Sequence, residues 1–248
     1  MQIDIQGKRI LIFGDSHSHR GATAGPDAVD VTETSTTRAT SPGDLFGSWL
    51  LVGAASVRLN AKVGRSAWNL FSRENGGAIL DREAARRPDI VFVILGTNDI
   101  GLNVELDAKR MAQIRVAFVE AGARVICVGP PMFPPKKTTR SGLNLNVGAE
   151  RVVAMERRVF GDGFIDARPM TEDIVTKAQG RAGDGIHFNP KTGARKWARR
   201  LAAEIGIVVP GEASRREPLS ERARIVLAVS AIAALGATAA ILAGTAAR

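Results

Sequence analysis

The sequence predicts a single α/β domain, a three-layer α/β/α sandwich around a parallel sheet. Short apolar runs alternate with longer segments in which apolar residues recur at helical spacing. A chain of 248 residues is long enough to bury one sizeable core and too short for several large domains. Because parallel strands are joined by right-handed crossovers, this alternation favours a doubly wound sheet with helices on both faces.

We expect each strand at a short apolar run bounded by turns, over residues 9–13, 61–63, 90–95, 124–128 and 163–166. The stretch 41–60 has Ser41 and Pro42 as a helix start signal, followed by a long apolar stripe. A second helix over 104–122 ends on Gly122, the residue type typical of a helix C-terminus. The last amphipathic helix lies within 189–206 and closes on Gly206.

The stretch 20–43 differs from the rest of the domain because it is long, rich in Thr, Ala and Gly, and without strong periodicity. A long loop inside a compact domain usually serves function or is disordered. Since it follows the first strand directly, we expect a lid or specificity loop over the site, with disorder as the alternative.

The carboxy-terminal part contains an uncharged run over residues 225–247, which is 23 residues (247 − 225 + 1). Crossing the hydrocarbon core of a membrane takes about 20 residues. Ten of the 23 are alanine, which weakens insertion, so a helix buried in an oligomer is the alternative. We therefore expect a main domain over 1–208, a polar linker over 209–222 and a hydrophobic helix, interpreted as a membrane anchor, over 223–248.

The charges around this run predict its sidedness. Only Arg248 follows the run. Four arginines precede it, namely Arg215, Arg216, Arg222 and Arg224. The positive-inside rule then places the main domain on the cytoplasmic side, and no secretory signal precedes it. A soluble cytoplasmic protein and a component of a virion are the alternatives. Small residues recur every four positions within the run, at Gly236, Ala240 and Gly244. This spacing would let two such helices pack closely and predicts a possible homo-oligomer.

The overall charge is +9, from 34 Lys and Arg against 25 Asp and Glu, which favours contact with anionic surfaces. Only this charge suggests a nucleic-acid binder, since we find no binding motif and few aromatic residues for base stacking. We therefore expect no nucleic-acid partner. The single cysteine, Cys127, lies in an apolar run, so we expect a buried thiol and no intrachain disulfide.

Polar motifs stand where the strands end or just before the last helix. They are Gly14-Asp15-Ser16, Gly64-Arg65-Ser66, Gly96-Thr97-Asn98-Asp99 and Asp184-Gly185-Ile186-His187. Ligand sites of such sheets lie beyond the carboxyl ends of the strands, so these motifs are expected to meet at one edge. A serine hydroxyl becomes a good nucleophile when an imidazole takes its proton and an acceptor fixes the imidazole tautomer. Ser16, His187 and Asp184 have the side chains that this chemistry requires.

Over residues 8–206 these motifs resemble the four blocks of the SGNH, or GDSL-type, hydrolases. The resemblance implies a flavodoxin-like sheet of five parallel strands in the order 2-1-3-4-5, and an esterase site. Carried over by position, it implies Ser16 as nucleophile, His187 as base and Asp184 as its partner. The oxyanion hole would be formed by the backbone N–H groups of Ser16 and Gly64 and by the Asn98 amide. We expect Asp15 and Asp99 to bond nearby backbone rather than to take part in the chemistry.

One pair of residues in the first motif departs from the family pattern. His17 and His19 follow the serine, where an apolar residue is more usual, and they are expected either to line the pocket mouth or to be solvated. Asp15-x-His17 is also similar to the first metal-binding piece of calcineurin-like phosphoesterases. That family needs further histidines, whereas this chain has three in all. Three cations after the fourth strand are further candidates for binding an anionic substrate: Lys136, Lys137 and Arg140.

The function predicted from the sequence is that of a serine esterase which needs no metal and no cofactor. Its substrate would be an acyl or O-acetyl ester of a small molecule, glycan or lipid, cleaved through an acyl-enzyme intermediate. Two alternatives stay open. One is a catalytically silent scaffold that its carboxy-terminal helix positions in a membrane or assembly, and the other is a metal-dependent phosphoesterase.

Overall fold

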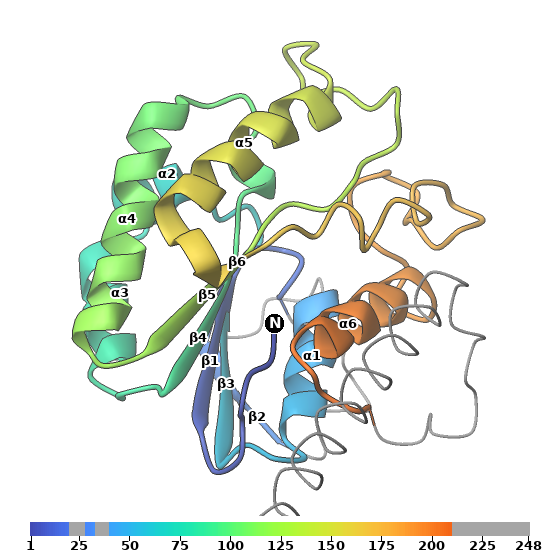
Figure 1. Ribbon diagram of the computed structural model, residues 1–248. Coiled ribbons are helices and arrows are strands. Elements are labelled where there is room, and N and C mark those ends of the chain that lie inside the picture. The colour runs from blue at the N-terminus through green and yellow to red at the C-terminus, as the bar shows by residue number, and fades with distance from the viewer. Residues whose placement is uncertain (20–27, 33–39, 210–248) are drawn as a thin grey trace, which may run out of the picture. The chain divides into compact units, whose positions relative to one another are not determined.

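A computed structural model describes residues 1–19, 28–32 and 40–209 of the chain. Most of this part forms a sandwich of three layers (Figure 1). Helices α2 to α5 cover one face of the sheet, and α1 and α6 cover the other. The predicted linker over 209–222, apart from its first residue, and the predicted anchor over 223–248 lie outside the described residues. Within the described part, no helix is both long and apolar enough to cross a membrane.

The sheet has six strands in the order β2-β3-β1-β4-β5-β6. Their bounds are Arg9–Gly14 for β1, Ala28–Val31 for β2, Ser56–Ala61 for β3, Ile90–Ile94 for β4, Arg124–Val128 for β5 and Phe164–Ile165 for β6. Five of them, from β3 to β6 in this order, are parallel and confirm the predicted order 2-1-3-4-5. Gly14 pairs with Ala61 on one side and Ile94 on the other, so three strands end at one level.

The sixth strand corrects the prediction of five. β2 lies inside the stretch 20–43, for which we expected no regular structure, and it pairs antiparallel with β3 at the sheet edge. Short edge strands carry little periodic signal of their own because most of their stabilisation comes from the neighbouring strand. The expected lid falls mainly on residues 20–27 and 33–39, which lie outside the described part.

The helices are α1 Pro42–Leu50, α2 Ala67–Arg73, α3 Gly76–Ala84, α4 Val104–Glu120, α5 Leu145–Phe160 and α6 Gly193–Glu204, with 3₁₀ turns η2 at Thr97–Asp99 and η3 at Gly161–Gly163. The predicted start of α1 is confirmed, since Ser41 Oγ accepts a hydrogen bond from Asp44 N at 3.2 Å. Gly122 follows α4 with a φ of +88°, and Ala123 N bonds Phe118 O at 3.0 Å, which closes the helix end.

The second strand was predicted in the wrong place. The apolar stripe over 41–60 belongs to two elements, because α1 ends at Leu50 and β3 begins at Ser56, whereas the predicted strand covered 61–63. Both α1 and β3 place apolar residues in the core, and the turn between them is also apolar in sequence although its Val52 is exposed. A continuous apolar run is compatible with either element, and only the pairing with β1 resolves it.

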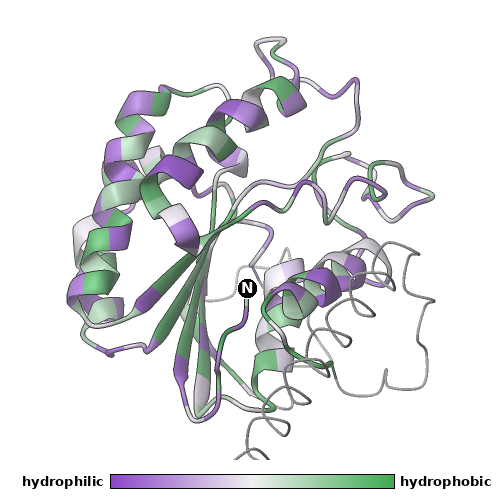
Figure 2. Ribbon diagram, in the orientation of Figure 1, coloured by the Kyte–Doolittle hydropathy of each residue, from purple (hydrophilic) through white to green (hydrophobic). Residues whose placement is uncertain are grey.

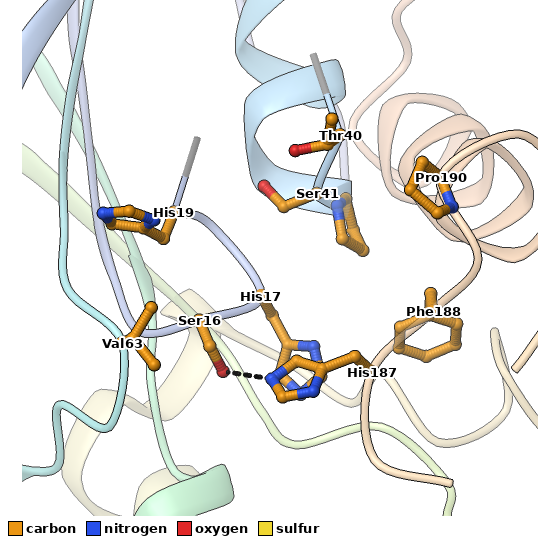
Figure 3. A pocket seen from close by; sticks show the side chains of 10 residues that line it. Ser16, His17, His19, Thr40, Ser41, Val63, His187, Phe188 and Pro190 are labelled. Atoms are coloured by element: carbon orange, nitrogen blue, oxygen red, sulfur yellow. Dashed lines mark hydrogen bonds between the residues drawn. The ribbon is translucent and has the colours of Figure 1, made fainter. Parts of the chain in front are cut away.

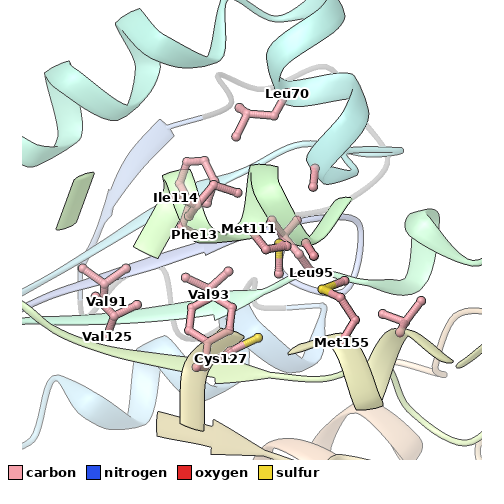
Figure 4. Packing of buried hydrophobic residues seen from close by; sticks show 14 of the residues in the cluster. Phe13, Leu70, Val91, Val93, Leu95, Met111, Ile114, Val125, Cys127 and Met155 are labelled. Carbon is pink, nitrogen blue, oxygen red and sulfur yellow. The ribbon is translucent and has the colours of Figure 1, made fainter. Parts of the chain in front are cut away.

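The core between the sheet and helices α2 to α5 is built from aliphatic, aromatic and sulfur-containing side chains (Figure 4). Phe13, Val93 and Met111 are fully buried there. Figure 2 shows the matching pattern, with apolar strands and helices whose polar residues face outward. Cys127 lies in this core, which confirms the predicted buried thiol, and burial raises the pKa of this thiol well above the usual range.

Candidate active site

Ser16 stands in the turn that follows β1 directly. Asp15 shapes this turn, because its carboxylate accepts a hydrogen bond from His17 N at 2.8 Å and its carbonyl accepts from the backbone N–H groups of Ser18 and His19 at 3.0 Å each. The predicted structural role of Asp15 is therefore confirmed. The turn presents the Ser16 hydroxyl beyond the carboxyl end of the central strand, where ligand sites of this type of sheet lie.

His187 lies against Ser16 although the two are 171 residues apart in the sequence (Figure 3). The Ser16 Oγ to His187 Nε2 distance is 2.9 Å, and His187 Nδ1 lies 2.5 Å from Asp184 Oδ2. In the tautomer that suits this arrangement, Nδ1–H donates to Asp184 and Nε2 accepts from the serine hydroxyl. The structure thus joins the three residues in one chain of hydrogen bonds.

The loop around Asp184 holds the carboxylate in place. Its second oxygen, Oδ1, accepts from Ile186 N at 2.9 Å and from His187 N at 3.0 Å. Partial burial opposes ionisation of Asp184, but the hydrogen bonds from the side chain and backbone of His187 and from Ile186 outweigh it and lower the pKa to about 2. Asp184 is therefore ionised and oriented toward the imidazole at neutral pH.

The candidate oxyanion-hole groups lie around the same strand ends. Asn98 Nδ2 donates to Arg65 O at 3.0 Å and lies 3.4 Å from Asp15 Oδ2, which brings it beside the residues next to Gly64 and Ser16. Gly64 has a φ of +76°, a conformation that favours glycine. The backbone N–H groups of Ser16 and Gly64 donate to no residue in the described part of the chain. These two N–H groups can donate to a substrate without breaking such a bond.

Arg65 is a buried residue that the sequence analysis did not single out. Its guanidinium donates to Gly14 O at 3.3 Å, to Asn60 O at 3.1 Å and to Glu74 Oε2 at 3.0 Å. It also lies over the Phe13 ring, 4.8 Å from the centroid. These contacts tie the loop that carries Gly64 to the end of β1. The only sequence signal was an arginine inside a polar motif at a strand end.

Arg181 is a second buried residue that was missed. Its guanidinium donates to Ile186 O at 2.6 Å and to Met132 O, and it stacks 3.8 Å from the centroid of the Phe188 ring. Burial lowers its pKa to about 9, against the opposing effect of the Asp184 carboxylate. Because Ile186 lies between Asp184 and His187, Arg181 fixes this loop to the segment after β5. No local motif marks such a role.

His17 and His19 both line a cavity of about 400 Å³ beside Ser16 (Figure 3). His17 is only 2% exposed, so the expected alternative of a solvated side chain is wrong for it. Its ring packs against His187 and Trp197, with centroids 5.6 and 5.4 Å away. Burial, then electrostatic interactions with His187 and Arg181, lower the pKa of His17 well below its usual range. The His17 side chain is therefore an uncharged part of the cavity wall.

The three predicted anion-binding cations are not among the residues that line this cavity. Lys136 and Arg140 are exposed, and Lys137 is half-buried beside Gly185 of the loop between Asp184 and His187. Their role in substrate binding stays a prediction. In the described part of the chain, no group of three or more His, Cys, Asp and Glu side chains is arranged to hold a metal ion.

Asp99 joins the loop after β4 to the start of α2, because its Oδ1 accepts a hydrogen bond from Ala67 N at 2.8 Å. This contact confirms its predicted structural role. Burial, with a smaller effect from Asp107, raises the pKa of Asp99 to about 7, and burial likewise raises that of Asp15 to about 7. The pKa values of these two carboxyl groups beneath the site are thus well above the usual range for aspartate.

The raised pKa of Asp99 predicts a pH dependence of stability. A carboxyl with a higher pKa in the folded than in the unfolded protein stabilises the fold below the unfolded value, and this contribution is lost as the pH rises through about 7. Asp99→Asn keeps the acceptor for Ala67 N and cannot ionise. Between pH 5 and pH 8 the variant should lose less free energy of unfolding than the wild type, by on the order of 2 kcal/mol. Urea unfolding at both pH values measures this, and equal losses would contradict it.

Comparisons with known proteins agree with this geometry. The model of the GDSL-like lipase/acylhydrolase family matches residues 12–195. No curated protein matches the sequence significantly. Among solved structures, Axe2, an acetylxylan esterase from Geobacillus stearothermophilus, is 16% identical with a TM-score of 0.61, over 83% of this chain and 98% of its own.

LAE5, an alpha/beta hydrolase enzyme from the metagenome of Lake Arreo, Spain, is 19% identical with a TM-score of 0.61, over 81% of this chain and 96% of its own. At such identities the structural likeness shows a shared fold. The family match covers most of the chain and includes the turn of Ser16 and the loop of Asp184 and His187. The chain therefore belongs to the GDSL-like lipase/acylhydrolase family, a family of serine hydrolases that act on carboxylic esters.

Proposed function

We propose that this protein hydrolyses acyl or O-acetyl esters through an acyl-enzyme intermediate on Ser16. The observation that carries the proposal is the chain of hydrogen bonds from Ser16 Oγ through the His187 imidazole to Asp184. Structures of Axe2 in which a serine, an aspartate or a histidine is replaced by alanine are called catalytic mutants, and there the aspartate stands three residues before the histidine. Asp184 and His187 have the same spacing.

In the first half-reaction the Ser16 oxygen attacks the ester carbonyl while His187 Nε2 takes the hydroxyl proton. Asp184 stabilises the resulting imidazolium and holds it in the orientation needed for transfer. The N–H groups of Ser16 and Gly64 and the Asn98 amide donate hydrogen bonds to the former carbonyl oxygen and so stabilise its negative charge. When the intermediate collapses, His187 gives its proton to the departing alcohol.

In the second half-reaction water takes the place of the alcohol. His187 removes a proton from the water, which attacks the acyl carbonyl, and the same oxyanion donors stabilise the second tetrahedral intermediate. Collapse returns the proton to Ser16 Oγ and releases the carboxylic acid. In each half-reaction His187 therefore acts first as a base and then as an acid.

Labelling with a fluorophosphonate probe tests the proposal. Wild-type protein should be labelled and should release p-nitrophenol from p-nitrophenyl esters, whereas Ser16→Ala should do neither, because the probe reacts with an activated serine hydroxyl. Ser72→Ala is the matched control, since Ser72 is exposed on α2. Equal labelling of Ser16→Ala would show that another residue reacts. A folded wild type that is neither labelled nor active would favour the silent scaffold.

We also propose that residues 225–247 anchor the protein in a membrane with the main domain on the cytoplasmic side, and that Gly236, Ala240 and Gly244 let two such helices pair. The length and uncharged composition of this run and the arginines before it support the proposal. The full chain should float with membranes in a density gradient, and a chain ending at Pro210 should stay in the soluble fraction. Identical distribution of the two proteins would reject the anchor.

A further inference from the structure

The cavity beside Ser16 has walls without formal charge. Among the described residues it is lined by Ser16, His17, His19, Thr40, Ser41, Pro42, Val63, His187, Phe188 and Pro190. None of these is Asp, Glu, Lys or Arg, and His17 is held neutral by burial. A charged substrate group placed here would lose water without gaining an opposite charge, which is costly. The cavity therefore suits an uncharged group.

Val63 is the most informative residue of this wall. It follows β3 in the chain, immediately before Gly64, and 59% of its surface is exposed. Val63 is an apolar side chain exposed to water beside the nucleophile, so binding of an apolar group that covers it is favourable in free energy. Any chain attached to a carbonyl held at Gly64 N–H lies within reach of Val63, since the two residues are neighbours.

The mechanism places the leaving alcohol and the acyl chain of the ester on opposite sides of Ser16. The leaving oxygen must lie at His187 Nε2, which protonates it, and the carbonyl oxygen must lie in the oxyanion hole. The acyl chain is the remaining substituent and points away from His187. Figure 3 shows Val63 and His19 on the opposite side of Ser16 from His187 and Phe188.

We infer that the acyl group of the substrate is an uncharged apolar chain longer than acetyl, bound in this cavity against Val63. The inference rests on the proposed function, because only a carbonyl bound at Ser16 places the chain there. A methylene group takes roughly the volume of a water molecule, about 30 Å³, so a six-carbon acyl chain needs roughly 180 Å³. The cavity of about 400 Å³ extends on both sides of Ser16 and has room for this chain as well as for part of the alcohol, whereas an acetyl group is too short to cover Val63.

The test measures kcat/KM of the full-length protein for p-nitrophenyl acetate, butyrate and hexanoate, which share one leaving group. We expect hexanoate to exceed acetate by at least about tenfold, since each buried methylene adds to binding in the transition state. Acetate esters of longer alcohols are measured alongside. A rate that rises with the length of the alcohol and not of the acyl chain would overturn the inference, because the cavity would then bind the leaving group.

Val63→Ser tests the contact itself, and Val52→Ser is its control because Val52 is 68% exposed in the turn after α1 and does not line the cavity. The ratio of hexanoate to acetate kcat/KM should fall about threefold or more in Val63→Ser and stay at the wild-type value in Val52→Ser. An unchanged ratio in Val63→Ser, or a wild type that prefers acetate, would overturn the inference and leave the esterase proposal standing. A protein that is neither labelled at Ser16 nor active on any ester would overturn both.

Discussion

Asp184→Asn is expected to lower kcat for ester hydrolysis by on the order of 10³- to 10⁴-fold. Asp184 accepts the hydrogen bond from His187 Nδ1 at 2.5 Å, and its pKa of about 2 keeps it ionised at neutral pH. The amide can turn its NH₂ group toward Nδ1, which favours the tautomer with the proton on Nε2. That tautomer cannot take the proton of Ser16. Steady-state kinetics with a p-nitrophenyl ester measures the loss.

The matched control is Asp173→Asn. Asp173 is also partly exposed, and it pairs with Arg200 and, at 3.4 Å, with Lys196, so it makes strong ionic contacts away from the site. We expect less than a twofold change in kcat for this variant. A comparable loss in both variants would mean that Asp184 acts only by stabilising its loop, whereas a small loss in Asp184→Asn would remove it from the mechanism.

Asn98→Ala is expected to lower kcat by about 100- to 1000-fold, the usual effect of removing one oxyanion-hole donor. The Asn98 amide is already oriented by Arg65 O, so it needs no rearrangement when negative charge develops on the substrate oxygen. Because this charge is largest in the transition state, KM should change much less than kcat. Kinetics with the same ester separates the two parameters.

Asn103→Ala is the control for this prediction. The Asn103 side chain caps α4 by accepting from Glu105 N and Leu106 N at 3.1 and 3.0 Å, and it has no contact with the site. Its loss should reduce the free energy of unfolding by about 1 kcal/mol and leave kcat unchanged. If Asn98→Ala lost activity only in proportion to its loss of folded protein, the role in the oxyanion hole would be wrong.

Features that depend on short-range patterns could be predicted from the residues alone. The motif that ends β1 pointed to Ser16, and Asp184 and His187, three residues apart in one loop, were candidates for its partners before the structure showed the three side chains together. The start of α1 at Ser41 and Pro42 and the end of α4 before Gly122 also followed from neighbouring residues. Such signals survive folding because capping, turns and strand-end loops are local in origin.

Features that depend on strand pairing and burial became clear only in the folded chain. β2 forms and β3 takes its position because each strand hydrogen-bonds to a neighbouring strand. An apolar run in the sequence does not show which neighbour that is. The burial of His17 was equally unpredictable, since it depends on Trp197 far along the chain. Arg65 and Arg181 resemble surface arginines in the sequence. They support the site because folding removes them from water and brings carbonyl groups, and for Arg65 also Glu74, within reach of their guanidinium groups.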